Sequence, residues 1–145
     1  MRIYITTAVP QPYREVAQKF DQSLFEALSP PFPRARLLRY DGNRPGDEVH
    51  VRLHFGFFRQ TWHSLITDAG APPGLVYFVD EGRKLPFFLR HWRHRHEIRQ
   101  HGTGSLVVDD ISFRSPFRLL DYLLYPLMYL QFAYRKPVYR RRFGG

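Results

Sequence analysis

The feature that most constrains the fold is a two-residue alternation of apolar and polar residues in the middle of the chain. Val49, Val51 and Leu53 alternate with His50 and Arg52, a period typical of a strand with one buried and one solvated face. Comparable runs predict further strands at residues 36–40, 59–67, 75–80, 88–99 and 105–113. The short segments between them are rich in Gly, Pro, Asn and Asp, the residues of hairpin turns. Strands joined in this way predict an antiparallel meander.

The segment before the meander predicts one more strand and a helical region. Ile3–Val9 alternates as a strand does, and apolar residues then recur three and four apart from Tyr13 to Leu28. Residues 21–23 are a candidate break that would divide this region into two short helices. Prolines keep residues 29–33 extended.

The segment after the meander predicts a long helix. Residues 117–134 are apolar around most of a helical circumference, so we expect the concave face of the sheet to enclose them. Ser115 is the predicted N-cap, Pro116 the first helical residue and Pro126 the position of a kink. Residues 136–145 are basic, and we expect this tail to be partly frayed.

Length and composition indicate one α+β domain at residues 1–135, followed by the basic tail. A chain of 145 residues matches a single domain, and 43% hydrophobic with 17% aromatic residues argues against disorder. The lack of cysteine excludes disulfides and Cys-based metal sites. The first seven residues lack the apolar core of a secretory signal, and Arg118 and Asp121 interrupt the most apolar stretch. We therefore expect a cytoplasmic protein without a membrane span.

The order of the elements and several short motifs resemble the SRPBCC superfamily, which includes START lipid-transfer domains, polyketide cyclases and birch-pollen-allergen-like proteins. The motifs are similar to those of its small bacterial cyclase/dehydrase-like branch. They are LSPP at 28–31, RYDG at 39–42, GDEV at 46–49, WRHRH at 92–96, DDISF at 109–113 and FAYR at 132–135. The chain departs from the branch at residues 85–92, where members commonly read G-P-F-x-x-W, so details of ligand entry are not carried over.

This resemblance implies a helix-grip fold of order β-α-α-β6-α. A curved antiparallel sheet of about seven strands would wrap on the long C-terminal helix. An apolar cavity between them would hold a lipid, polyketide, quinone or similar molecule. Most members of the branch have no assigned reaction, and no cofactor is implied.

The strand at 88–99 carries the residues most suited to chemistry. Alternation places Trp92, His94, His96 and Ile98 on one face, and the arginines between them on the other. Inward imidazoles need hydrogen-bond partners. If the turn at Gly102 pairs Ile98 with Ser105, His94 stands opposite Asp109. The pair would either act as acid and base, orient a ligand, or simply anchor the sheet to the helix.

Further ligand-binding candidates follow from the expected cavity. The hydroxyl groups of three helix tyrosines are candidate partners for the histidines, and apolar residues of the strands are candidate lining. The full set is Leu53, Phe55, Trp62, Tyr77, Tyr122, Tyr125, Leu127 and Tyr129.

A metal site is not predicted from these residues. His94 and His96 have the spacing to share a zinc ion, but local spacing supplies no third ligand. His50 and His54 alternate to the opposite, wet face of their strand and do not converge with His94.

The charge balance leaves two interpretations open. The chain has 22 basic and 13 acidic residues, a net charge of +9. The excess forms either a solvated exterior or a surface that docks on anionic lipid. No nucleic-acid-binding motif is present. The residues concerned are Arg93, Arg95, Arg99, Arg135, Lys136, Arg140, Arg141 and Arg142.

Three functional hypotheses follow. The first is binding of a small hydrophobic molecule without catalysis. The second is a polyketide cyclase or dehydratase with His94 and Asp109 as acid and base. The third is a peripheral membrane or partner-docking protein that uses the basic surface.

Overall fold

The computed structural model describes residues 1–144 and shows a seven-stranded antiparallel sheet in the order β1-β7-β6-β5-β4-β3-β2. Strands β2 to β7 pair with their chain neighbours, and β1 adds to the free edge of β7. The predicted meander and α+β class are therefore confirmed. The strands are β1 (Arg2–Val9), β2 (Arg34–Tyr40), β3 (Glu48–His54), β4 (Arg59–Gly70), β5 (Leu75–Lys84), β6 (His91–His101) and β7 (Gly104–Arg114).

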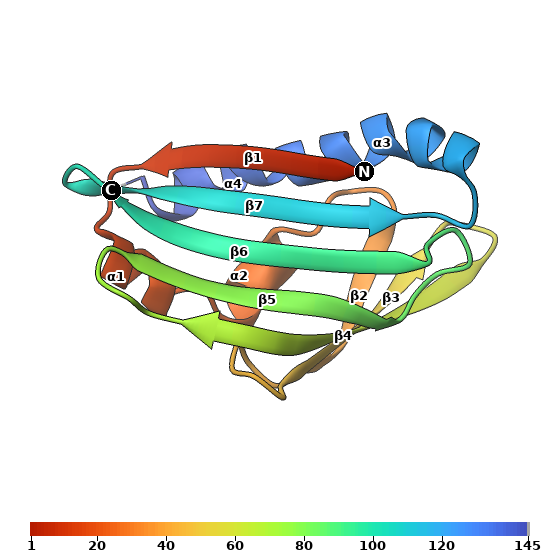
Figure 1. Cartoon of the computed structure of the whole chain (residues 1–145), viewed down its shortest axis with the longest axis horizontal. Coiled ribbons are helices and arrows are strands. Elements are labelled where there is room, and N and C mark those ends of the chain that lie inside the picture. Colours follow the sequence, from red (N-terminus) through yellow and green to blue (C-terminus); the bar gives the residue numbers. More distant parts are fainter. Residues whose placement is uncertain (145) are drawn as a thin grey trace.

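Four helices lie on the concave side of the curled sheet, with β2, β3 and β4 folded toward them (Figure 1). They are α1 (Tyr13–Gln18), α2 (Gln22–Ala27), α3 (Arg118–Ala133) and α4 (Arg135–Arg142). The break between α1 and α2 covers residues 19–21, slightly before the suggested 21–23. Asp21 caps the second helix, because its carboxylate accepts a hydrogen bond from the Leu24 backbone N–H at 2.9 Å.

The start of α3 differs from the prediction. The helix begins at Arg118, with Phe117 at the N-cap position, so Ser115 does not cap it and Pro116 precedes it. Asp121 in the first turn instead reaches back, and its Oδ1 atom accepts from the Ser115 backbone N–H at 2.6 Å. A carboxylate at this end of the helix also suits the helix dipole.

The C-terminal segment is not frayed as expected. Residues 135–142 form α4, and Val138, Tyr139 and Phe143 expose 2% or less of their surface. They pack with Val16, Leu24, Leu28 and other residues of the sheet and of α1 and α2. Their spacing puts an apolar stripe on one side of an otherwise arginine-rich helix. Residues 136–143 therefore pack on the same domain as the rest of the chain.

The long helix is far less enclosed than its sequence predicts. Among the residues of α3, all of which the structure describes, Met128 alone is buried. Leu119, Leu123 and Leu130 expose 60–66% of their surface. A helix that is apolar all round can bury only one side against a single sheet, so the other side remains exposed. No helix within residues 1–144 is both long and apolar enough to cross a membrane.

Candidate functional site

A cavity of about 800 Å³ lies between the concave face of the sheet and α3. Its walls come from α2, the following proline-rich linker, strands β2 to β6 and α3, and they are mostly apolar and aromatic. Seven of the residues singled out from the sequence line it: Leu53, Phe55, Trp62, Trp92, His94, His96 and Leu127.

The four tyrosines predicted for the cavity wall do not line it. Tyr77 alternates with the lining residue Phe78 and points to the outer face, where the Arg95 guanidinium lies 4.0 Å over its ring. Tyr122, Tyr125 and Tyr129 share a different stripe of α3 from the lining residues. The lining residues of α3 are Leu120, Leu124, Leu127, Met128, Leu130, Gln131 and Phe132. The tyrosine hydroxyls therefore do not partner the histidines.

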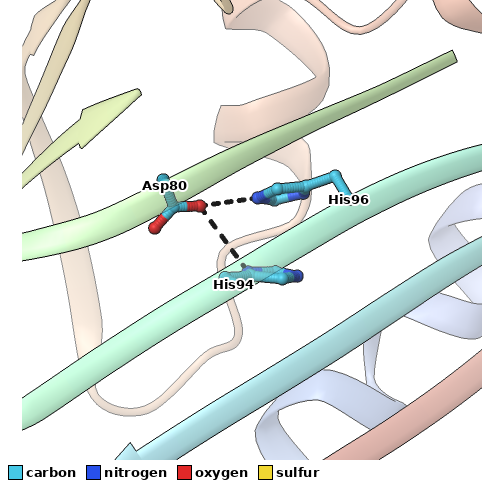
Figure 2. Close-up of side chains that lie close together, drawn as sticks. All are labelled: Asp80, His94 and His96. Atoms are coloured by element: carbon cyan, nitrogen blue, oxygen red, sulfur yellow. Dashed lines mark hydrogen bonds and ion pairs between the residues drawn. The ribbon is translucent and has the colours of Figure 1, made fainter. Parts of the chain in front are cut away.

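Asp80, His94 and His96 form a polar cluster in this mostly apolar wall. Figure 2 shows the three side chains close together. The two imidazole rings stack with centroids 3.6 Å apart, because residues i and i+2 of β6 face the same side. Asp80 reaches them from the neighbouring strand β5, directly opposite His94. Its Oδ2 atom lies 2.6 Å from His96 Nε2 and 3.8 Å from His94 Nδ1.

The other carboxylate oxygen of Asp80 is held separately. The Trp92 indole N–H donates to Asp80 Oδ1 at 3.2 Å. This bond fixes the carboxylate so that Oδ2 faces the histidines. On the far side of the cluster, the Phe78 ring stacks on His96 at 4.2 Å.

Asp109 lies behind His94 and does not line the cavity. His94 Nε2 is 2.9 Å from Asp109 Oδ1, so the hydrogen-bonded pair predicted from the sequence is present. The predicted register is wrong by two residues, because Ile98 pairs with Val107 and Asp109 stands directly opposite His96. The turn lies one residue later in the chain than assumed: residues 102 and 103 form a two-residue turn between the paired residues His101 and Gly104, and Gly102 has a φ of +59°. A shift of two residues preserves the face, so the side chains of His94 and Asp109 still meet on the diagonal.

Arg135 completes the cluster, which contradicts its expected place on the basic exterior. Its Nη1 atom donates to Asp109 Oδ1 at 3.1 Å, and its guanidinium lies 4.6 Å from the Phe132 ring centre. The basic face is also less free than predicted on β6. Arg95 and Arg99 both bond to Glu97, whose side chain is buried between them.

The charges of the cluster follow from burial and these partners. Burial would raise the pKa of Asp109, but the Arg135 guanidinium and the His94 imidazole outweigh it and lower that pKa to about 2. Burial and the neighbouring His94 lower the pKa of His96 to about 4. His96 is therefore neutral at pH 7, while Asp109 is ionised. Burial also opposes ionisation of Asp80, but its bond to His96 dominates and lowers its pKa.

Asp80 and Arg135 are the functional candidates that sequence reasoning missed. The strand predicted at residues 75–80 ends at Asp80, but β5 continues to Lys84, and alternation puts Asp80 on the same face as Phe78. An acidic residue on the inward face of a strand was the available signal. The arrangement offers a neutral imidazole, a carboxylate and a second imidazole backed by a carboxylate. Such groups can bind a polar head group, transfer a proton or ligate a metal ion.

The comparisons with known proteins agree with this architecture. No protein-family model matches the sequence, and no curated protein sequence is significantly similar to it. Protein Ms6760 from Mycobacterium smegmatis is similar in structure, with a TM-score of 0.65, 18% identity, and coverage of 92% of this chain and 84% of that chain.

Two enzymes are also similar in structure. The ZhuI aromatase/cyclase from Streptomyces sp. R1128 has a TM-score of 0.58 and 14% identity, covering 98% of this chain and 94% of that one. Norcoclaurine synthase from Thalictrum flavum has a TM-score of 0.64 and 11% identity, covering 98% and 96%. These likenesses, together with the sheet wrapped on a C-terminal helix, show that the chain has a helix-grip fold.

Proposed function

We propose that the chain binds a small, largely apolar molecule in the cavity, with a polar end of that molecule placed against Asp80, His94 and His96. The observation that carries this proposal is the composition of the wall, which is mostly apolar and aromatic and holds one compact cluster of three ionisable side chains. A volume of about 800 Å³ lies within the range of ligand cavities. An apolar body would supply affinity, and the cluster would supply orientation.

The apolar wall sets a quantitative expectation. Each buried methylene contributes about 0.8 kcal/mol, so two added methylenes tighten binding by roughly tenfold. In a series of straight-chain alcohols, affinity should rise by this step until the cavity is full and then stop rising. A flat series would argue against a cavity that takes apolar chains.

The direct test is native mass spectrometry of the purified protein, followed by organic extraction of any adduct. A Val51→Trp substitution fills the cavity from β3, and Arg52→Trp places the same bulk at the next position, outside the lining set. We expect the adduct, and binding of added decanol, to be lost in Val51→Trp and kept in Arg52→Trp. Equal binding by both variants would refute this site.

Acid–base catalysis of the cyclase or dehydratase type is a second candidate. The His94–Asp109 bond favours it, because a carboxylate that holds Nε2–H leaves Nδ1 free as a base on the cavity side. One of the similar structures is an aromatase/cyclase. A catalytic role requires turnover of an aromatic polyketide mimic that disappears in His94→Gln while ligand binding persists. Unchanged turnover in that variant would exclude His94 as the base.

Docking on an anionic membrane would explain how an apolar ligand reaches the cavity. Six phenylalanines form a continuous aromatic rim, with neighbouring ring centres 4.8–6.1 Å apart. Phe57 and Phe87 are 92% and 67% exposed, and Phe87 also lines the cavity, so the rim lies where the cavity meets solvent. The rim consists of Phe32, Phe55, Phe57, Phe58, Phe87 and Phe88.

The charges around the rim suit this partner. Residues 49–67 and 82–96, which carry most of the rim, contain no Asp or Glu. Exposed Arg59, Lys84 and Arg90 flank it. Vesicles with anionic lipid should bind the protein more tightly than neutral ones, and the difference should shrink with salt. Phe57→Ser should weaken this binding, whereas Tyr4→Ser, which removes a 48% exposed aromatic from β1, should not. Equal effects of the two substitutions would rule out the rim.

A further inference from the structure

The geometry points to a metal site formed by Asp80, His94 and His96 at the cavity wall. Their three ligand atoms lie within 4.8 Å of one another, on side chains that are largely or fully buried. Two imidazoles and one carboxylate form a donor set that suits Zn²⁺, Co²⁺ or Fe²⁺. Within residues 1–144, no other group of three such side chains converges in this way.

The spacing of the ligand atoms is close to what an ion needs. A tetrahedral ion at about 2.0–2.2 Å from each ligand separates neighbouring ligand atoms by about 3.3 Å. Asp80 Oδ2 lies 2.6 Å from His96 Nε2 and 3.8 Å from His94 Nδ1. The two distances to Asp80 bracket this value, and the stacked rings of His94 and His96, with centroids 3.6 Å apart, would splay so that both lone pairs face one ion. Figure 2 shows the three groups turned toward one another from two adjacent strands.

The groups around the ligands orient them as metal ligands are usually oriented. Asp109 accepts the Nε2–H of His94, which leaves the lone pair of Nδ1 directed toward Asp80. Trp92 occupies Asp80 Oδ1, so Oδ2 remains for the ion. His96 would bind through Nε2 after its proton moves to Nδ1, a change of tautomer without change of charge.

The charges also favour a cation at this point. Asp109 and Arg135 neutralise each other at 3.1 Å. The ionised carboxylate of Asp80 is then uncompensated, and a divalent cation would balance it.

A metal at this cluster would restrict the chemical class of the small molecule bound in the cavity more than the shape of the cavity does. Three protein ligands leave at least one coordination position open, and His94 and His96 both line the cavity. An oxygen donor such as a carboxylate, an enol or a hydroxy-ketone on an apolar body would fill that position. This consequence rests on the proposed function, whereas the metal site itself does not.

The test is a titration of chelator-treated, tag-free protein with Co²⁺, followed by visible absorption. Binding at the cluster should give the intense bands of a low-coordinate Co²⁺ site, and Zn²⁺ should displace it. A second pair of histidines can compete for Co²⁺, since His50 and His63 stack 3.6 Å apart on β3 and β4. A His63→Gln variant removes that pair and should keep full Co²⁺ affinity.

Substitutions of the ligands decide the matter. Asp80→Asn, which preserves shape, should weaken Co²⁺ binding at least tenfold, and Asp109→Asn should weaken it by about 10- to 100-fold through His94. His96→Gln is the second ligand variant if Asp80→Asn fails to fold by circular dichroism. Val51→Trp should block apolar ligands and leave Co²⁺ binding intact, which separates this site from the proposed function. Co²⁺ affinity that is unchanged in the folded ligand variant, or lost in His63→Gln, would overturn the site.

Discussion

Replacing Arg135 by methionine would leave the buried carboxylate of Asp109 without its guanidinium partner. Asp109 is 1% exposed, and Arg135 Nη1 lies 3.1 Å from its Oδ1 atom. Removing one member of a buried pair costs about 3–5 kcal/mol, because the remaining charge keeps its desolvation penalty. At roughly 2–4 °C per kcal/mol for a domain of this size, the melting temperature should fall by about 10 °C.

The measurement is urea unfolding of the wild type and the variant at pH 7 in the presence of a chelator. Arg140→Met is the matched control, because Arg140 lies on the same helix and is exposed. It should cost less than about 0.5 kcal/mol. The double variant Asp109→Leu with Arg135→Met should recover part of the loss, since it removes both charges but leaves the buried Nε2–H of His94 without its acceptor.

The pH dependence gives a second check on the same pair. In the wild type the pKa of Asp109 lies at about 2, below its ordinary value of 3.8. Its stabilising contribution is therefore complete above about pH 4 and lost as the pH falls through 2. Without Arg135, burial dominates and raises this pKa, so protonation then favours the folded variant. The stability difference between the two proteins should shrink from pH 7 to pH 4. A cost below about 1 kcal/mol at pH 7, or one that grows on acidification, would refute the reasoning.

Three further expectations concern other parts of the chain. Phe143→Ala should cost about 3–5 kcal/mol of unfolding free energy, because a fully buried ring leaves a cavity under α4; a frayed tail would give almost no change. Glu97→Ala should cost about 1 kcal/mol or less by urea unfolding, since the freed arginines can reach solvent; a loss near that of Arg135→Met would contradict this. Phe57→Ala should leave the melting temperature unchanged within about 1 °C because the ring is 92% exposed, and a clear loss would show that the rim is structural.

The sheet could be predicted from the sequence because strand alternation and turn residues are local signals. The β6–β7 hairpin shows the limit of this reasoning. The turn is centred on residues 102 and 103, one residue later than the assumed pairing requires, and this shifts the register by two residues. The face of every residue survives such a shift, but the partner directly opposite does not. The inward face of His94 was therefore predictable, and the place of Asp109 opposite His96 was not.

The helices show that a local sequence pattern does not predict which face of a helix is buried or which distant residue it contacts. The apolar circumference of α3 predicts a helix, but not which stripe the cavity takes or how much of the rest stays exposed. In α4 and at its C-cap, the buried side chains of Val138, Tyr139 and Phe143 outweigh the arginines that surround them in the sequence. Arg135 illustrates the same point at a single residue, because composition suggests solvent and only the fold brings it to Asp109.

The polar cluster is costly for stability, and that cost bears on function. Buried ion pairs are commonly replaced by apolar residues with no loss of stability, or with a gain. Here two carboxylates, two imidazoles and a guanidinium lie together beside an apolar cavity that aliphatic residues would fill well. Anchoring the sheet to the helix does not require them, because Ile3, Ile111 and Met128 pack there without any charge. Ionisable groups placed at such a cost in a cavity wall are typical of binding and catalytic sites. The cluster is therefore kept either for a ligand or as a structural anchor, and the stability of the Asp109→Leu, Arg135→Met double variant separates these two explanations. A double variant as stable as the wild type favours a cluster kept for its ligand, whereas a large loss favours a structural anchor.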